Sequence, residues 1–379
     1  MRTTEHLVVG AGLAGAATAW RLAQRGHEVT VVERTEPAAH DGSSHGSARI
    51  FRYAYPERAY AQMVVDAATG WVELAREHGA SLLAPAPAVD HGPLRDPRAL
   101  ARVLEEVGVE HELLSAAEAG ARWPQLRVDG EVLVQPGGAV IDAEGAVLAM
   151  LDQARAHGAR ILTGWPLGSL ERTATGFVAR AEDGRSLTAG RIVVAAGAWL
   201  PDLVQRLALP AGFVAALPRL DVTEENAFHF PYRDAHPHGT WPTTIHKTPQ
   251  ILAYSLPGGR DAGSAGQKVA EHAAGRSIGS ASRRSGAVDP SNRERVTAYV
   301  REHLPGLVPE PYAETTCLYT TTPTEDFVVD GVDGVTVLSP CSGHGAKFAP
   351  LLGELAADVA TGSAPAPERF RVGAAPARG

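Results

Sequence analysis

Residues 6–33 read HLVVGAGLAGAATAWRLAQRGHEVTVVE. The apolar run His6–Val9 predicts a short buried strand. The segment Ala16–Arg25 has helical spacing and is closed by Gly26, and Glu28–Val32 predicts a second strand. A strand, a glycine-rich turn, a helix and a second strand are typical of the first unit of a parallel sheet that binds a dinucleotide.

The turn between the first strand and the helix, residues 10–15, has the spacing GxGxxG. Gly10 permits the tight turn, Gly12 lets the backbone approach a pyrophosphate, and Gly15 lets the helix pack closely on the strand. Free N–H groups at the helix N-terminus favour the negative phosphates. Glu33, eighteen residues after Gly15, stands where a carboxylate accepts hydrogen bonds from a ribose diol and disfavours the extra phosphate of NADP. The stretch therefore predicts binding of the ADP half of a dinucleotide.

The composition excludes several classes of protein. The 379 residues are enough for two domains. Lys and Arg total 35 against 43 Asp and Glu, a formal charge of −8, and no basic block is dense enough to indicate a nucleic-acid partner. The two cysteines, Cys317 and Cys341, are too few for a disulfide framework and favour a reducing compartment. The first apolar run is too short for a membrane span or a signal peptide, so we expect a cytoplasmic protein. We also expect it to be a monomer that acts on a small molecule.

Strand-like runs alternate with helical patterns in three separated segments, 5–33, 143–197 and 325–362. This alternation predicts a parallel sheet assembled from distant parts of the chain. The segments between them are rich in Pro, Gly, Thr, His and short β-like runs, which favours a second, mostly antiparallel domain inserted twice. The predicted division is a first domain over 1–82, 140–212 and 315–379, and a substrate domain over 83–139 and 213–314.

Three further motifs follow the glycine turn. Residues 42–55 read GSSHGSARIFRYAY, residues 317–320 read CLYT, and residues 342–348 read SGHGAKF. In this order, and over nearly the whole chain, they resemble the monomeric sarcosine oxidase family, which includes N-methyltryptophan oxidase and pipecolate oxidase. The resemblance implies an α/β fold with a Rossmann-type FAD-binding domain, an inserted substrate domain built on an antiparallel sheet, and FAD as the cofactor.

Residues 191–199, RIVVAAGAW, resemble the second FAD-contact strand of flavoprotein oxidases, although they also fit a core strand of any α/β sheet. By the same resemblance, Cys317 is the cysteine that holds FAD through a thioether at the 8α carbon, which requires a thiolate beside the ring. The alternative is that Cys317 is a small buried apolar residue. Cys341 has no comparable context, and we assign it no role.

Arg49 and Arg52 are three residues apart, which places them on one face of a helix or on opposite faces of a strand. The resemblance implies that Arg52 and Lys347 bind a substrate carboxylate, for which the guanidinium fork is well suited. It also implies that Arg49 and His45 lie beside the flavin ring. The alternatives are solvated charges for the basic residues and a structural role for His45.

Lys268 follows the segment Tyr254-Ser-Leu-Pro257 after a glycine-rich loop. In the family, a lysine in this region activates O2, because a buried ammonium stabilises the charge that develops on oxygen. The loop here is longer than usual, so the register of Lys268 is open, and without the resemblance it reads as a loop lysine. His272 is implied as a pocket histidine, and Tyr254 and Tyr319 as pocket walls.

The loop before Lys347 precedes an amphipathic helix with Phe348, Leu351, Leu352, Leu355 and Val359 on its apolar face. Its N-terminus, aimed at the flavin N1–C2=O edge, would stabilise the negative charge that develops on reduction. The turn and the resemblance together predict these cofactor-binding residues: Gly10, Gly12, Leu13, Ala14, Gly15, Glu33, Arg34, Ser43, Ser44, Arg49, Ala196, Gly197, Trp199, Cys317, Gly343, His344, Gly345 and Lys347.

The implied activity is oxidation of a secondary or N-substituted amino acid to an imine, with O2 reduced to H2O2. Ala346 stands where the family pattern commonly has an aromatic residue, which implies a substrate larger than sarcosine. Three alternatives remain: a flavin dehydrogenase or desaturase with another electron acceptor, a non-catalytic flavoprotein, and a NAD-dependent dehydrogenase. We predict no metal site.

Overall fold

The structure, a computed structural model, describes residues 3–237 and 239–374. Its first sheet has eight strands. The parallel strands lie in the order β9 (Arg160–Leu162), β2 (Val29–Val32), β1 (Thr3–Val9), β12 (Ser186–Val194) and β20 (Val335–Ser339). Antiparallel strands extend the sheet: β10 (Leu167–Thr173), β11 (Gly176–Ala181) and β19 (Val328–Val332). All four residues of β2 are buried, as expected for a strand covered on both faces.

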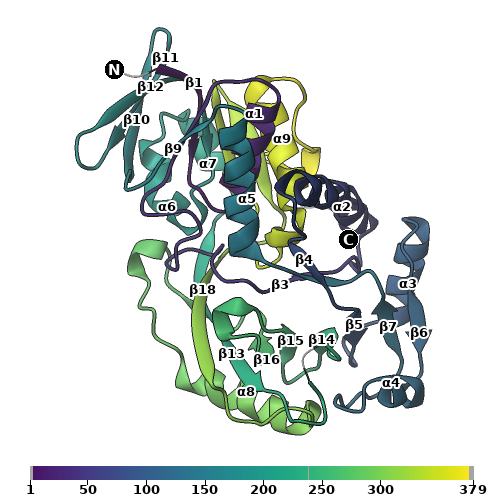
Figure 1. Cartoon of the computed structure of the whole chain (residues 1–379). Coiled ribbons are helices and arrows are strands. Elements are labelled where there is room, and N and C mark those ends of the chain that lie inside the picture. Colours follow the sequence, from purple (N-terminus) through teal and green to yellow (C-terminus); the bar gives the residue numbers. More distant parts are fainter. Residues whose placement is uncertain (1–2, 238, 375–379) are drawn as a thin grey trace.

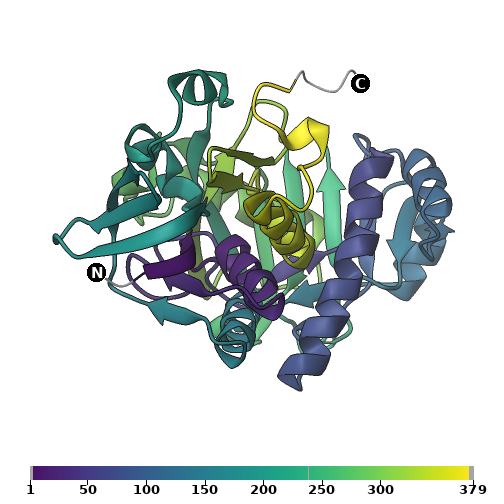
Figure 2. The ribbon, with the colours of Figure 1, turned by 90° about the horizontal axis from the view of Figure 1, so that it is seen from above.

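Three helices lie together against this sheet (Figure 1): α1 (Leu13–Gln24), α5 (Ala143–Ala156) and α9 (Ala349–Thr361). Their alanines and glycines let the backbones approach closely. A Cβ atom on Gly353 of α9 would lie 2.6 Å from the backbone of Ala17 in α1. The long helix α2 (Arg58–His78) lies between this helical layer and the part of the chain that contains α3 (Pro97–Glu106) (Figure 2).

The second sheet has nine strands. They run in the order β17 (Arg276–Ser277), β13 (Asp221–Pro231), β16 (Gly266–Glu271), β15 (Leu252–Pro257), β14 (Thr243–Lys247), β5 (Ala88–His91), β7 (Val132–Gln135) and β6 (Glu112–Leu114), and β18 (Ala313–Thr321) also pairs with β13. The strands are antiparallel except for β14 and β5, which pair in parallel. This pair joins the two distant chain segments into one sheet.

A third, three-stranded sheet connects the two larger sheets. Its strands lie in the order β3 (Arg49–Phe51), β8 (Ala139–Ile141) and β4 (Leu83–Pro85). It presents Arg49 at the boundary between the two halves of the molecule. Short helices α6 (Leu200–Leu203) and α7 (Ala211–Ala216) follow β12.

The segments predicted to be mostly antiparallel also contain helices α3 (Pro97–Glu106), α4 (Ala116–Arg122) and α8 (Pro290–His303). Both α3 and α8 begin after an Asp-Pro pair. Asp96 accepts a hydrogen bond from the Ala99 amide at 2.9 Å, and Asp289 accepts one from the Ser291 amide at 2.9 Å. Proline at the first helical position costs nothing, because its missing N–H has no partner there.

The predicted fold class is confirmed: a mixed α/β sheet with a glycine-turn unit at its centre, and a separate, largely antiparallel sheet. The domain boundaries remain a prediction. The strand that carries Cys317, β18, pairs with β13 in the second sheet, although a boundary at residue 315 assigns it to the first domain. Within the described residues, no helix has both the length and the apolar composition needed to cross a membrane.

Candidate active site

A cavity of about 570 Å³ runs along the carboxyl ends of the parallel strands. Glu33, Arg34 and Trp199 line one end, Gly12 and Ser43 the middle, and Cys317 and Gly343 the other end. This volume falls in the range of roughly 300–1,000 Å³ that is usual for small-molecule and cofactor sites.

The glycines of the first turn shape this cavity. A Cβ atom on Gly10, whose φ is +101°, would lie 2.5 Å from the carbonyl oxygen of Ala195, and a Cβ atom on Gly12 would lie 2.9 Å from Oγ of Ser44. Only glycine leaves the backbone free to face the cavity at these positions. The N-cap residue Gly12 has no side chain to cap the helix, and the amide of Leu13 donates instead to Ser44 Oγ at 3.1 Å. These features fit the pyrophosphate of a dinucleotide at the N-terminus of α1.

Glu33 is fixed by the same turn. Its carboxylate accepts hydrogen bonds from the amides of Ala11 at 2.7 Å and Thr35 at 3.1 Å. Burial raises the pKa of this carboxyl above its usual value, while the amide hydrogen bonds oppose the shift. The Arg34 guanidinium lies 5.6 Å from the Trp199 ring at the same end of the cavity, where the geometry suits an adenosine.

A second cavity of about 340 Å³ adjoins the first on the side of the nine-stranded sheet. The two share five lining residues: Arg49, Cys317, Tyr319, Gly343 and Ala346. A flat ring seated at this junction would therefore extend its attached chain into the first cavity and expose one face to a reacting molecule in the second cavity.

Two cations meet at one side of the second cavity. Lys347 is 5 % exposed, and its ammonium donates to the Tyr55 hydroxyl at 2.9 Å and to the His344 carbonyl at 2.8 Å. The Arg52 guanidinium lies 4.9 Å from the Tyr55 ring and donates to the Ala54 carbonyl. Burial and then the charge of Arg52 lower the pKa of Lys347 well below its usual value. A carboxylate between Arg52 and Lys347 would relieve this cost.

Lys268 is a strand residue rather than a loop residue. It lies in β16, opposite His229 of β13 and Leu256 of β15, and is 6 % exposed. Its ammonium donates to the Ala48 carbonyl at 3.4 Å. Burial, reinforced by Arg49, lowers the pKa of Lys268 to about 8.

The junction itself is held by Arg49 and a tyrosine pair. The Arg49 guanidinium donates to the carbonyls of Ser43 at 3.0 Å and His45 at 2.9 Å. Tyr254 and Tyr319 are linked by a side-chain hydrogen bond, and burial raises both their pKa values. Burial also raises the pKa of the Cys317 thiol, whereas Arg49 and Lys268 lower it.

The histidines near the site are neutral at pH 7. Burial lowers the pKa of His272 to about 4 and that of His344 to about 3. His344 hydrogen-bonds the Tyr55 hydroxyl at 3.1 Å, and the ring of His272 lies 5.7 Å from that of Tyr319. His45 is 4 % exposed, burial lowers its pKa to about 3, and its Nε2 has no partner among the described residues.

Most residues predicted for the site line the expected cavity, with four differences. Gly15 does not line the first cavity; it packs against the Gly10 carbonyl, where no side chain would fit. His344 and Lys347 line the second cavity, not the first. His45 lines neither cavity; it is buried in the loop, and its backbone carbonyl accepts a hydrogen bond from Arg49.

The expected helix begins later than predicted. Residues 345–348 form a 3₁₀ turn, and α9 starts at Ala349, which itself lines the first cavity. A Cβ atom on Gly343, whose φ is +71°, would lie 2.5 Å from the Tyr319 ring. The glycines therefore let the loop pass close to the junction.

Several cavity residues were not predicted: Tyr55, Glu57, Tyr60, Arg95, Lys247, Thr324, Glu325 and Cys341. Most come from connecting segments that only the tertiary fold brings together. Lys247 carried a signal in the sequence, because the chain has only three lysines and two of them were already assigned to the site.

Comparison with known proteins places this geometry in context. A family model described as FAD dependent oxidoreductase (DAO) matches residues 5–359. The chain is 29 % identical over 371 residues to monomeric sarcosine oxidase of Bacillus sp. (strain NS-129), covering 94 % of this chain and 92 % of that protein. It is 30 % identical over 362 residues to N-methyl-L-tryptophan oxidase of Yersinia pestis (strain Pestoides F), covering 93 % of each.

Solved structures share the fold. NikD, an amino acid oxidase essential for nikkomycin biosynthesis, superimposes with a TM-score of 0.84 at 23 % identity, covering 99 % of this chain and 98 % of that one. L-proline dehydrogenase from P. horikoshii superimposes with a TM-score of 0.83 at 20 % identity, covering 98 % and 97 %.

Proposed function

Because the chain belongs to the DAO family of FAD-dependent oxidoreductases, we propose that it oxidises the carbon–nitrogen bond of a secondary or N-substituted amino acid and passes the electrons to O2. The observation that carries this proposal is the pair Arg52 and Lys347, held beside the junction of the two cavities. Relatives named for sarcosine and for N-methyl-L-tryptophan support the substrate class.

The first cavity holds FAD in this proposal. Gly10, Gly12 and the start of α1 would bind the pyrophosphate, Glu33 the ribose, and the Gly343–Gly345 backbone the ring. When bound, the flavin accepts a hydride equivalent from a carbon next to nitrogen and delivers the electrons to an acceptor. The amides of the 3₁₀ turn and of α9 supply positive potential where negative charge develops.

The chain's own residues orient the substrate. Arg52 and Lys347 bind the carboxylate, which directs the amine toward the junction lined by Tyr254 and Tyr319. Because the pKa of His272 is about 4, this histidine is neutral near pH 7 and cannot provide positive charge to the amine site. The amine need only lose its ammonium proton, so no strong base is required.

Two finer features belong to the same proposal. Cys317, which lines both cavities, would hold the flavin through a thioether; burial raises the pKa of its thiol, and the charges of Arg49 and Lys268 oppose that shift and so favour the thiolate. Ala346, also at the junction, leaves room for a substrate larger than sarcosine.

Anaerobic stopped-flow tests the proposal. Mixing the holoenzyme with sarcosine, N-methyl-L-tryptophan and L-pipecolate should bleach the flavin, with the bulkier amines at least as fast as sarcosine. The reductive rate should rise with pH toward the pKa of the bound amine, because only the neutral amine reacts. If none of the three amines bleaches the flavin, the proposed function is contradicted. Bleaching without oxygen consumption afterwards would indicate a dehydrogenase or desaturase.

A further inference from the structure

All three lysines of the chain, Lys247, Lys268 and Lys347, line the second cavity. The sequence has 35 lysines and arginines in total, and all of the others are arginines. The two side chains are not equivalent: lysine presents a compact ammonium on a flexible stem, and arginine a wide planar fork. Lys268 and Lys347 already have proposed roles, whereas Lys247 has none.

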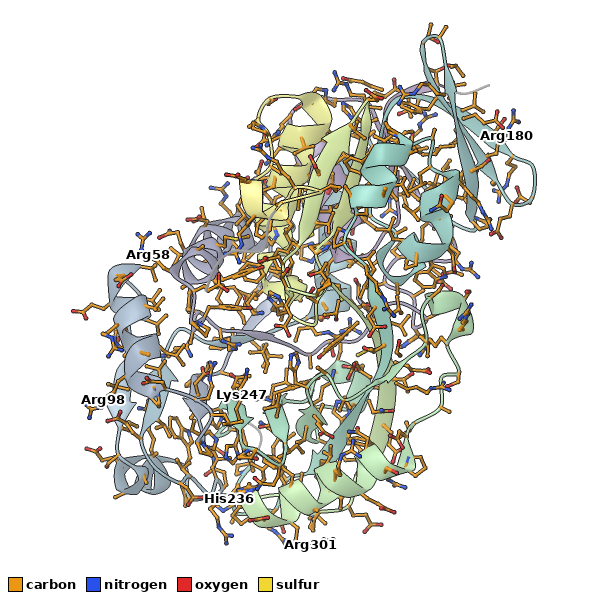
Figure 3. The ribbon with its side chains drawn as sticks, turned by 180° about the vertical axis from the view of Figure 1, so that it is seen from behind. Arg58, Arg98, Arg180, His236, Lys247 and Arg301 are labelled. Carbon is orange, nitrogen blue, oxygen red and sulfur yellow. The ribbon has the colours of Figure 1, made fainter. Side chains whose placement is uncertain are left out.

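Lys247 ends strand β14 and faces the cavity from the nine-stranded sheet. In Figure 3 Lys247 lies within the outline of the molecule, whereas the labelled Arg98, Arg180 and Arg301 lie at its edge. It is half-buried and forms no ion pair with any residue of 3–237 or 239–374. Burial, and then the charges of Arg95 and Arg52, lower its pKa below the usual value.

The loop after β5 holds Arg95 beside this lysine. The Leu94 amide donates to the Lys247 carbonyl at 3.1 Å, and a Cβ atom on Gly92 would lie 2.5 Å from the same oxygen. The Arg95 side chain is 5 % exposed and pairs with the buried Asp90, but its Nε has no partner among the described residues. The pairing with Asp90 holds the guanidinium of Arg95 in place where it lines the cavity.

The charges around the cavity do not balance. Six cationic side chains line it: Arg49, Arg52, Arg95, Lys247, Lys268 and Lys347. The acidic side chains that line it are Glu57 and Glu325, both exposed, and Glu57 pairs with Arg369 at 2.8 Å. The carboxylate of one amino acid on Arg52 and Lys347 leaves Lys247 without an ion-pair partner among the described residues; Glu325 and the Arg95-bound Asp90 only partly oppose the lowering of its pKa. Buried charge without a partner is costly.

We propose that the substrate carries a second acidic group, and that Lys247 and Arg95 form the subsite that binds it. This rests on the proposed function and narrows its substrate class to N-substituted amino acids with an additional carboxylate, phosphonate or sulfonate. The ammonium of Lys247 supplies a charge that has no ion-pair partner among the described residues, and the guanidinium of Arg95 lines the cavity beside it.

Calorimetric titration of the holoenzyme tests the subsite with non-oxidisable probes of matched shape. Glutarate is compared with glutaramate, and succinate with succinamate, since each pair differs by one charge. The diacid should bind roughly 10- to 100-fold more tightly. The phosphonate and sulfonate counterparts, 3-phosphonopropionate and 3-sulfopropionate, show which acid the subsite prefers.

Variants assign the preference to Lys247. Lys247→Met should reduce it to within about threefold, while the affinity for glutaramate stays unchanged, and Lys247→Arg, which keeps the charge, should retain part of it. Arg301→Met, which changes an exposed cation on α8, is the matched control and should have no effect. Flavin absorbance reports whether each variant is folded. A wild type without the preference, or a Lys247→Met variant that keeps it, would overturn the subsite.

The outcome is distinguishable from failure of the proposed function. If secondary amino acids bleach the flavin and no diacid preference exists, the subsite is wrong and the proposed function stands. If the diacid preference exists and depends on Lys247 but no secondary amine bleaches the flavin, the subsite stands and the reaction is wrong.

Discussion

Lys268 illustrates how burial sets the chemistry of one side chain. Its pKa is about 8 because burial and the nearby Arg49 charge disfavour the ammonium. The ammonium therefore predominates at pH 7 and is lost as the pH rises through about 8. A stepwise transfer of electrons to O2 places negative charge on oxygen, and a buried cation stabilises it.

Replacing Lys268 by Met should slow reoxidation of the reduced enzyme by O2 about 100-fold or more. In the wild type this rate should fall as the pH rises through about 8, and the variant should lose that dependence. Stopped-flow mixing of reduced enzyme with O2 measures both. Anaerobic reduction by substrate is the control and should change far less. Equal reoxidation of variant and wild type would exclude this role.

Cys317→Ser should release the flavin when the protein is precipitated with acid, leaving a colourless pellet and a yellow supernatant. Cys341 is the matched control: it lines the first cavity, and its Sγ accepts the Thr320 amide at 3.3 Å. Cys341→Ser should keep a yellow pellet, as the wild type should. A colourless wild-type pellet would show that the flavin is not covalently bound.

At the scale of an element, the loop 342–348 depends on backbone that no side chain would permit. Gly343 has a φ of +71° and faces the rings of Tyr319 and His272, and a Cβ atom on Gly345 would overlap the Pro340 carbonyl. The loop is fixed further because the Trp71 indole of α2 donates to the Lys347 carbonyl at 2.8 Å. Helix α2 thereby positions a residue of the site.

Gly343→Ala should destabilise the protein by about 1–3 kcal/mol and lower the flavin content, because the new Cβ strains the backbone and displaces Tyr319. Gly120→Ala is the control, since Gly120 lies in α4 with no atom near its would-be Cβ. That change should be neutral or stabilise by up to about 1 kcal/mol. Urea unfolding and the visible flavin spectrum distinguish the two variants.

Over the whole molecule, burial lowers the pKa of eight histidines below the usual value of 6.5. They are His6, His45, His91, His229, His246, His272, His303 and His344. In the unfolded chain these histidines become protonated as the pH falls below about 6.5. In the folded protein the most buried of them become protonated only at about pH 3–4. The destabilising effect of these histidines is therefore absent above about pH 6.5 and grows as the pH decreases through this window.

The free energy of unfolding should thus decrease between about pH 6.5 and 4. His91→Phe should flatten the slope by up to about 1.4 kcal/mol per pH unit, because His91 is buried in a stack with His246, with ring centroids 4.1 Å apart, and phenylalanine does not titrate. His157→Phe, at an exposed position, is the control. Denaturant unfolding at several pH values measures the slopes, and equal slopes for wild type and His91→Phe would contradict the assignment.

The sequence predicted the parts of the fold that depend on local patterns. The glycine turn with its flanking strands and helix, and the fold class itself, are confirmed because steric limits on a turn and the period of apolar residues are local properties. Helices α3 and α8 were missed although each begins at an Asp-Pro pair, a start signal that the surrounding polar residues obscured.

By itself, therefore, the sequence determined a dinucleotide-binding α/β unit, its family and a set of candidate residues on three motifs. Only the tertiary structure decided that Lys268 is a buried strand residue, that His45 lies outside both cavities, and that Lys247 and Arg95 meet Arg52 in one cavity. Strand pairings such as β14 with β5 join residues more than 150 positions apart. The burial and charge that set each pKa arise from those long-range contacts, which no local pattern contains.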